Sequence, residues 1–161
     1  PAAVTSEQGI KESPEMRERS GISWKPFSKP VAIQLNTADS AELVSLPGIG
    51  PYYAKKILEY RDLLGGFVSG EQLMEIRGID RERYDLFAGR ITADTTLVKK
   101  VEIKDATYEQ LAKNPYVGGY LARSIIKFRD ENAALSTDLN LLLSVNIIKK
   151  ELYKILKFYF R

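Results

Sequence analysis

The stretch from residue 46 to residue 57, which reads LPGIGPYYAKKI, has the residue types needed to bind a phosphate group. Gly48 and Gly50 allow a tight turn and leave room for a phosphate to approach the backbone. Pro51 suits the first turn of a helix, and the first N–H groups of a helix have no partners within it. Because these N–H groups and the helix dipole favour an anion, the turn is a candidate phosphate-binding site.

The pattern around this turn predicts a helix on each side of it. Before it, residues 36–39 (NTAD) are of the capping type, and apolar residues at helical spacing predict a helix at 39–46. After it, the same spacing predicts a helix at 51–63, which Gly65-Gly66 ends as a C-cap. Ile49 is expected to be a buried peg that locks the two helices together. In the simplest alternative, the glycines serve only to form the turn.

A second turn is predicted at residues 77–80, which read RGID, between helices at 70–76 and 80–90. It keeps the glycine and the isoleucine of the first turn but has Asp80 where the second glycine would be. The last of these helices closes a first module, residues 33–93.

The order of these features resembles a known family. LPGIG followed by a helix resembles the helix-hairpin-helix motif. The wider run resembles the tandem helix-hairpin-helix domain of ComEA-type DNA-uptake proteins over residues 33–92. That run comprises Leu35-Asn36-Thr37-Ala38, Tyr60-Arg61, Gly65-Gly66-Phe67, Leu73 and Arg77-Gly78-Ile79. The resemblance implies contact with the minor-groove side of duplex DNA.

Residues 101–161 repeat the first module at an offset of 68, which brings Leu43 onto Leu111 and Ala54 onto Ala122. The other pairs are Ala38/Ala106, Pro47/Pro115, Gly50/Gly118, Tyr52/Tyr120, Ile57/Ile125, Arg61-Asp62/Arg129-Asp130 and Leu73/Leu141. The turns have diverged, since Gly48-Ile49-Gly50 becomes Tyr116-Val117-Gly118 and Arg77-Gly78-Ile79 becomes Val145-Asn146-Ile147. Asn146 tolerates a left-handed backbone, whereas Tyr116 would do so only with strain.

The predicted fold is therefore all-α, with two successive tandem helix-hairpin-helix modules of short helices. Residues 1–32 are interpreted as a linker or N-terminal arm, in which Trp24 and Phe27 would pack on the first module or contact a partner. Residues 94–98 are interpreted as a linker, and residues 99–161 as the second, divergent module.

Composition argues against an enzyme. The chain has no Cys and no His, which excludes disulfides, zinc sites and His-based catalysis. Asp80, Glu82 and Asp85 form a charged helix face without a second acidic cluster, and no nucleotide-binding glycine loop follows a predicted strand. We therefore predict no catalytic residues, no metal and no cofactor. No apolar run approaches the length of a membrane span.

Two functions follow from this pattern. The first is sequence-independent binding of double-stranded DNA, because nothing in the first turn is placed to read base edges. Lys55 and Lys56 would add an attraction that salt weakens. The expected DNA-binding residues are Gly48, Ile49, Gly50, Tyr52, Tyr53, Lys55, Lys56 and Gly78.

Charge suggests a further basic surface. Residues 33–93 hold 7 Lys and Arg against 9 Asp and Glu, whereas residues 99–161 hold 12 against 7. The last helix adds Lys150, Lys154, Lys157 and Arg161 on one expected face. Such a stripe is more often the solvated face of an amphipathic helix.

The second candidate function is protein–protein interaction or scaffolding through the same fold without DNA, as in the photosystem II subunit U, which resembles this domain. It would use an exposed aromatic patch at Tyr116, Tyr120, Tyr153, Phe158 and Phe160. If the DNA-uptake resemblance holds, we expect a periplasmic or membrane-anchored extracytoplasmic location, and otherwise a cytoplasmic one. No membrane contact is expected within residues 1–161.

Overall fold

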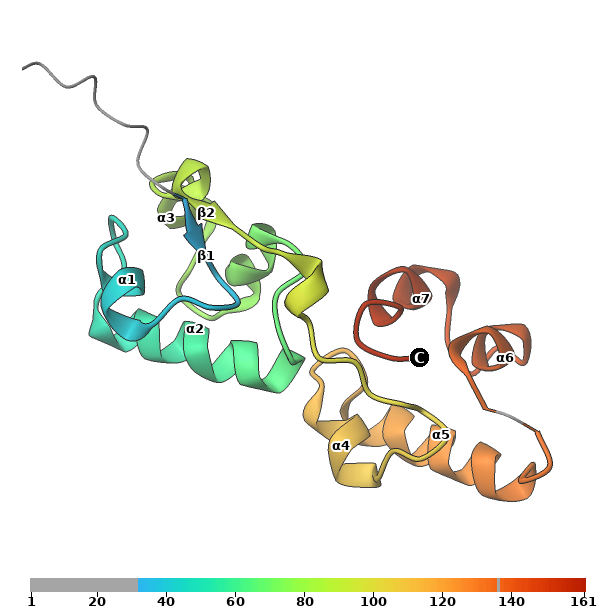
Figure 1. Cartoon of the computed structure of the whole chain (residues 1–161). Coiled ribbons are helices and arrows are strands. Elements are labelled where there is room, and N and C mark those ends of the chain that lie inside the picture. The colour runs from blue at the N-terminus through green and yellow to red at the C-terminus, as the bar shows by residue number, and fades with distance from the viewer. Residues whose placement is uncertain (1–31, 136) are drawn as a thin grey trace, which may run out of the picture. The chain divides into compact units, whose positions relative to one another are not determined.

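A computed structural model describes residues 32–135 and 137–161 (Figure 1). These residues belong to one compact unit, Val31–Arg161. The interpretation of residues 1–32 as an arm, with Trp24 and Phe27, falls outside the described residues except for Ala32. Among the described residues, no helix combines the length and the apolar character that crossing a membrane requires.

The first module contains three α-helices, two 3-10 helices and two very short strands. In chain order they are β1 (Ile33–Gln34), α1 (Ser40–Val44), α2 (Pro51–Leu64), η2 (Gly70–Glu75), α3 (Arg81–Asp85), η3 (Ala88–Arg90) and β2 (Ile91–Thr92). The long helix is predicted within one residue. The predicted helix 39–46 is shorter, 70–76 is a 3-10 helix, and 80–90 breaks at Phe87, whose backbone leaves the helical region (φ −132°, ψ 0°).

The second module repeats this order of helices after a short connection. The connection contains η4 (Thr95–Leu97), and the elements of the second module are α4 (Tyr108–Lys113), α5 (Gly118–Glu131), α6 (Leu139–Ser144) and α7 (Lys150–Leu156). The prediction of an all-α fold of short helices in two modules is confirmed, apart from the small strand pairs, which we did not predict.

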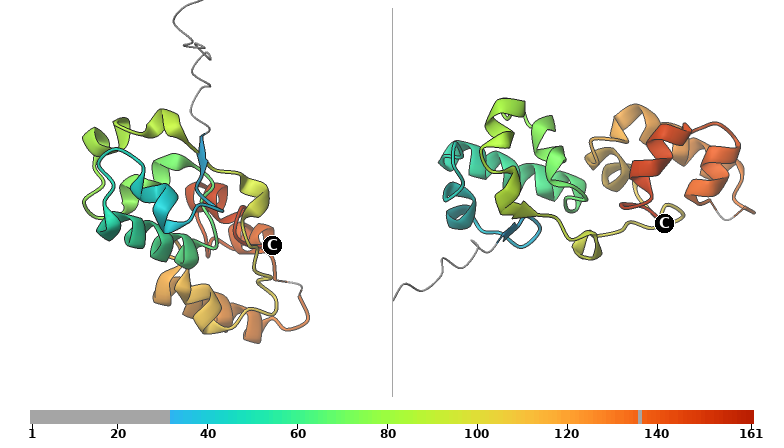
Figure 2. Two further views of the ribbon diagram at one scale, coloured as in Figure 1. Left: turned by 60° about the vertical axis from the view of Figure 1, so that its left-hand side comes forward. Right: turned by 90° about the horizontal axis from the view of Figure 1, so that it is seen from above.

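A parallel backbone pairing joins the two ends of each module. In the first, β1 pairs with β2, with Ile33 opposite Ile91, as the neighbouring strands in Figure 2 show. In the second, Val101 forms a parallel bridge with Phe160. These pairings lie between residues far apart in sequence, and segments this short carry no period-2 pattern from which a strand could be predicted.

The helix termini follow from local sequence. Asp39 and Thr107 start α1 and α4 with capping boxes, in which the side chain at N3 returns a hydrogen bond to the cap. Gly65 ends α2 in the left-handed conformation (φ +86°), so the predicted C-cap is confirmed. A Cβ at Gly65 would lie 3.1 Å from the carbonyl oxygen of Lys99, so this glycine also permits a close approach of the connection.

The offset of 68 residues relates the two modules from their start to the end of the long helix. The pairs Leu43/Leu111, Ala54/Ala122 and Ile57/Ile125 are all buried. Nη1 of Arg61 donates to the carbonyls of Leu35 and Ala38, and Nη1 of Arg129 donates to those of Ile103 and Ala106. The repeated arginines therefore tie each long helix to the segment that leads into its module.

We predicted that the repeat continues at the offset of 68 without a gap. The structure differs, because the offset becomes 69 beyond the long helix. Ser69 and Asp138 are the equivalent N-caps of η2 and α6, and Leu142 has the buried place of Leu73. The buried pair Phe87/Leu156 and the bridging pair Ile91/Phe160 keep this offset. The pairing of Leu73 with Leu141 was therefore wrong by one residue, because the second module has one extra residue between the positions equivalent to Ile57 and Ser69, which are Ile125 and Asp138.

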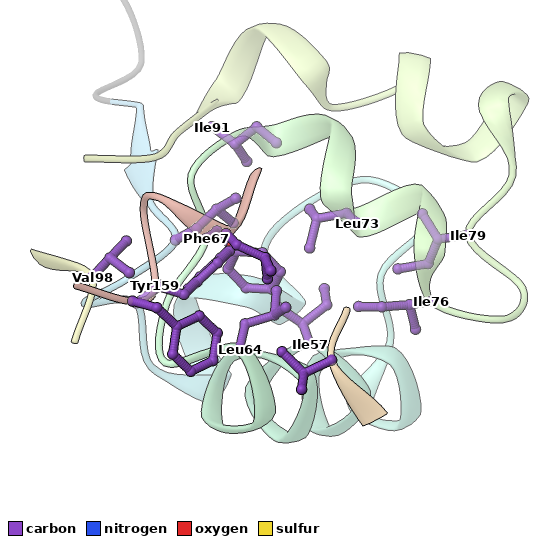
Figure 3. Close-up of a cluster of buried hydrophobic side chains, with 14 of the residues drawn as sticks. Ile57, Leu64, Phe67, Leu73, Ile76, Ile79, Ile91, Val98 and Tyr159 are labelled. Carbon is purple, nitrogen blue, oxygen red and sulfur yellow. The ribbon is translucent and has the colours of Figure 1, made fainter. Parts of the chain in front are cut away.

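Side chains of the second module complete the core of the first. Tyr159 is 1% exposed and lies beside Leu64 in the cluster that also contains Ile57 and Phe67 (Figure 3). Its hydroxyl accepts a hydrogen bond from Nε2 of Gln72 at 2.9 Å. Burial raises the pKa of Tyr159 to about 12. The two modules are therefore packed together by both apolar and polar contacts.

Candidate nucleic-acid interface

The first turn, between α1 and α2, has the geometry of a tight hairpin. The N–H of Ile49 donates to the carbonyl of Leu46 at 3.1 Å, and Gly48 has φ +78°, a conformation that favours glycine. Gly50 is extended (φ −92°, ψ −179°), and a Cβ there would meet nothing within 4 Å. The turn thus requires a glycine at 48 but not at 50.

Ile49 is 4% exposed, so the prediction of a buried peg is confirmed. Its side chain belongs to the core and is not available to DNA. Any contact of Ile49 with a ligand would therefore involve its backbone alone.

The start of α2 presents open N–H groups. Its N-cap is Gly50, which has no side chain to act as an acceptor, and Pro51 at N1 has no N–H. The N–H groups of Tyr52 and Tyr53, the second and third residues of the helix, therefore lack both an intrahelical acceptor and a side-chain cap. This is the arrangement that the sequence predicted for a phosphate site.

The second turn, between η2 and α3, repeats this geometry at an offset of 30 residues. Gly78 has φ +93°, and the N–H of Ile79 donates to the carbonyl of Ile76 at 3.0 Å. Ile79 is 1% exposed, and Asp80 is an extended N-cap like Gly50 (φ −81°, ψ 179°). The predicted second hairpin is confirmed in its geometry.

The two hairpins differ at their N-caps. Oδ1 of Asp80 accepts a hydrogen bond from the N–H of Arg83 at 2.9 Å. A carboxylate thus occupies the helix start that Gly50 leaves open in the first hairpin. Because this negative charge would repel a phosphate, the second hairpin is the poorer anion site of the two.

Tyr53 and Arg83, which are equivalent in the two hairpins, connect them. Nη1 of Arg83 donates to the carbonyl of Gly48 at 2.6 Å, and its guanidinium lies 4.5 Å from the centre of the Tyr53 ring. The Tyr53 hydroxyl in turn lies 2.7 Å from where a Cβ of Gly78 would be. Each helix thus packs on the turn of the other hairpin.

Arg83 was missed by the sequence analysis. The signal that could have revealed it is the match of Gly48-Ile49-Gly50-Pro51-Tyr52-Tyr53 to Gly78-Ile79-Asp80-Arg81-Glu82-Arg83.

The packing of Gly78 against Tyr53 makes a stability prediction. Gly78→Ala is expected to destabilise the chain by about 1–3 kcal/mol, because alanine at φ +93° is strained and its Cβ would overlap the Tyr53 hydroxyl. Chemical denaturation would measure the change. Gly89→Ala is the matched control, since a Cβ at Gly89 meets nothing within 4 Å. Equal stability of the two variants would contradict the prediction.

The lysines of the first hairpin share one carboxylate. The Nζ atoms of Lys55 and Lys56 lie 3.8 and 3.0 Å from Glu59, and the hydrogen bond and charge of Glu59 raise the pKa of Lys56. The Lys55 side chain is 76% exposed and that of Lys56 44%. Tyr52 lies beside them and is 66% exposed. Of the two lysines, Lys55 is therefore the more accessible cation.

The first turn of the second module differs from that of the first. The positive φ falls on Gly118 (+60°) and not on Tyr116, so the strain that we considered at Tyr116 does not arise. The Tyr116 hydroxyl donates to Glu75 at 2.8 Å and accepts from Nε2 of Gln72 at 2.7 Å. Burial raises the pKa of Tyr116. This diverged turn therefore packs against the first module, while Asn146 adopts the predicted left-handed backbone (φ +58°).

The exposed aromatic patch that we predicted on the second module does not form. The aromatic patch is wrong: Tyr120 is 82% exposed, but Phe160 is 3% exposed, and Tyr116, Tyr153 and Phe158 are half-buried.

The predicted basic stripe is also interrupted. Lys150 and Lys154 lie exposed on α7, which ends at Leu156. Lys157 is its C-cap, and Arg161 lies beyond the helix and pairs with Glu102.

Comparison with known proteins agrees with this geometry. The family model described as "Helix-hairpin-helix motif" matches twice, at residues 28–92 and 98–161. The chain is 28% identical over 129 residues to the mouse protein named endonuclease/exonuclease/phosphatase family domain-containing protein 1, and the match covers 62% of this chain but 23% of that protein. The human protein of the same name gives the same identity and coverage.

A bacterial protein from Haemophilus influenzae, named only as uncharacterized, is 38% identical over 60 residues, which cover 37% of this chain and 54% of that protein. The chain thus spans less than a quarter of the length of the mouse and human relatives. The search of solved structures gave no significant match. Because the family model covers most of the chain in two copies, this protein belongs to the helix-hairpin-helix family.

Proposed function

We propose that this chain binds double-stranded DNA without sequence preference, through the backbone of its first hairpin. Helix-hairpin-helix motifs are typically associated with non-specific DNA binding. The observation that carries the proposal is the open helix start at Tyr52 and Tyr53, beside the left-handed Gly48. Two N–H groups directed at one place, at the positive end of a helix of 14 residues, favour a phosphate oxygen.

The hairpin pair supports binding to the DNA backbone and not to base edges. The first hairpin offers backbone N–H groups, an exposed tyrosine and two lysines, which are group types that contact phosphate and sugar in protein–DNA complexes. Arg83 holds the carbonyl of Gly48 and the ring of Tyr53, so the hairpin is preorganised before DNA arrives. A preorganised site loses little side-chain entropy on binding.

The second module contributes charge in this proposal. Residues 99–161 carry the excess of Lys and Arg, which attracts the polyanion, while the first hairpin positions it. We propose residues 33–93 as the module that binds phosphate through its backbone and residues 99–161 as its basic partner.

The finer role rests on resemblance. The similarity of residues 33–92 to ComEA-type domains supports a role in DNA uptake or DNA handling, with the locations stated above. The mouse and human relatives have names that include an endonuclease/exonuclease/phosphatase family domain, and this chain aligns with less than a quarter of their length. We propose that it holds DNA and does not catalyse a reaction.

Titration of a fluorescent DNA duplex at several salt concentrations tests the proposal. Log K is expected to fall linearly with log salt, by about 0.9 for each phosphate that the chain neutralises. Two duplexes of unrelated sequence should bind with affinities within about threefold, because phosphate contacts carry no sequence information. No binding at low salt would overturn the proposal and favour protein–protein interaction through the same fold.

A further inference from the structure

The long helices α2 and α5 expose the same pair of side chains just after the first turn of each module. Tyr52 and Tyr120 are equivalent at offset 68 and are 66% and 82% exposed, more than any other large apolar side chain of residues 32–135 and 137–161. Lys55 and Arg123 follow three residues later and are also exposed. A spacing of three places each tyrosine and its cation on one face of the helix.

Most other positions around this pair have changed between the modules. The replaced pairs are Pro51/Gly119, Tyr53/Leu121, Lys56/Ser124, Glu59/Lys127 and Leu63/Glu131. The equivalent residues Asp62 and Asp130 are also identical in the two modules, but they lie near the C-terminal ends of α2 and α5, away from the tyrosines. An exposed side chain is not kept for packing, so a retained aromatic and cation beside a diverged turn indicate a contact with a ligand.

The second module has rearranged the charges around this pair. Where Glu59 pairs with Lys55 in the first module, α5 has Lys127, so that tyrosine, arginine and lysine stand at 120, 123 and 127. Lys127 pairs with Glu131 at 3.7 Å, whereas Arg123 has no carboxylate partner within 4 Å among the described residues. The Arg123 guanidinium lies 6.0 Å from the ring centre of Tyr108 and stays accessible.

We propose that Tyr120 and Arg123 form a second DNA-binding site, which contacts the sugar–phosphate backbone of the duplex through side chains. This inference rests on the proposed function and extends it to the module whose hairpin has diverged. The turn of that module has diverged in sequence, and the Tyr116 hydroxyl beside it binds Glu75 and Gln72 of the first module. In this contact, in the first turns of α5, the Tyr120 ring packs on deoxyribose and the Arg123 guanidinium binds phosphate.

Charge removal tests the site through the salt dependence of binding. Arg123→Ala is expected to weaken duplex binding about 3- to 10-fold near physiological salt and to reduce the slope of log K against log salt by about 0.9. Lys104→Ala is the matched control, because it also removes one positive charge from the second module. Lys104 lines a pocket with Arg129 and Asp130, at the opposite end of α5, and should leave the slope unchanged.

Ring removal tests the tyrosine. Tyr120→Ala should weaken binding about 3- to 10-fold, whereas Tyr120→Phe, which keeps the ring, should bind like the wild type. Because the side chains of Tyr120 and Arg123 are exposed, we expect each variant to fold. Circular dichroism of each variant checks this.

The outcomes separate this inference from the function on which it rests. If Arg123→Ala and Tyr120→Ala bind like the wild type while the wild type binds with a salt slope, the second site is overturned and the first hairpin remains. An equal loss in Lys104→Ala and Arg123→Ala would also overturn it, because the charge of the module as a whole would then explain binding. A wild type that does not bind overturns both.

Discussion

Gly50→Asp is expected to lower the affinity for duplex DNA about 10- to 100-fold while leaving the chain at least as stable as the wild type. Gly50 is extended, and a Cβ there meets nothing, so the backbone accepts a side chain without strain. An aspartate at this N-cap would accept the hydrogen bond of the Tyr53 N–H, as Asp80 accepts that of Arg83 in the second hairpin. The same carboxylate would occupy the phosphate site at the start of α2, and its negative charge would repel the phosphate.

This substitution separates binding from folding, which bulky changes at Gly48 cannot do. Gly48 requires its left-handed backbone, and a Cβ there would lie 3.3 Å from Leu86, so a loss of binding at Gly48 could arise from a distorted turn. Duplex titration together with thermal denaturation would measure both properties of the Gly50→Asp chain.

Two matched variants isolate the charge. Gly50→Asn caps the helix without a negative charge and should lose less affinity than Gly50→Asp. Asp80→Gly opens the second helix start and should raise the affinity about 3-fold or more, because it removes a negative charge that repels phosphate. If Gly50→Asp is folded and binds DNA like the wild type, the first hairpin is not the DNA site.

Tyr159→Ala is expected to lower the free energy of unfolding by about 3–5 kcal/mol, as for other large aromatic residues in a core. Tyr159 is 1% exposed and lies beside Leu64 of the first module (Figure 3). Its removal also takes away the hydroxyl that accepts the hydrogen bond of the buried Gln72 amide. Since single domains are stable by about 5–15 kcal/mol, this is a large share of the total.

The second part of this prediction is cooperativity. Because a residue of the second module completes the core of the first, the wild type should unfold in one transition in urea, and Tyr159→Ala should shift that whole transition. Tyr120→Ala is the control, as its side chain is 82% exposed and its loss should change stability by less than about 0.5 kcal/mol. Two separate transitions, with that of the first module unchanged in Tyr159→Ala, would contradict the coupling.

The sequence by itself determined the local elements of this protein. The turn at Gly48, the peg Ile49, the C-cap at Gly65 and the long helix could all be predicted, because each depends on residues within one or two turns of the chain. The repeat was also visible, since buried positions of one fold need the same apolar types in both copies. The glycine at position 50 was given a conformational role that it does not have, because a sequence shows that a side chain is absent but not the backbone angle.

Only the tertiary structure decided how these elements form a site. The bond from Arg83 to Gly48 spans 35 residues, that from Gln72 to Tyr116 spans 44, and that from Gln72 to Tyr159 spans 87. Helical periodicity shows which face of a helix is buried but not which residue of a distant element will cover it. For this reason the brace between the hairpins, the docking of Tyr116 and the one-residue change in the repeat offset became visible only when the chain was folded.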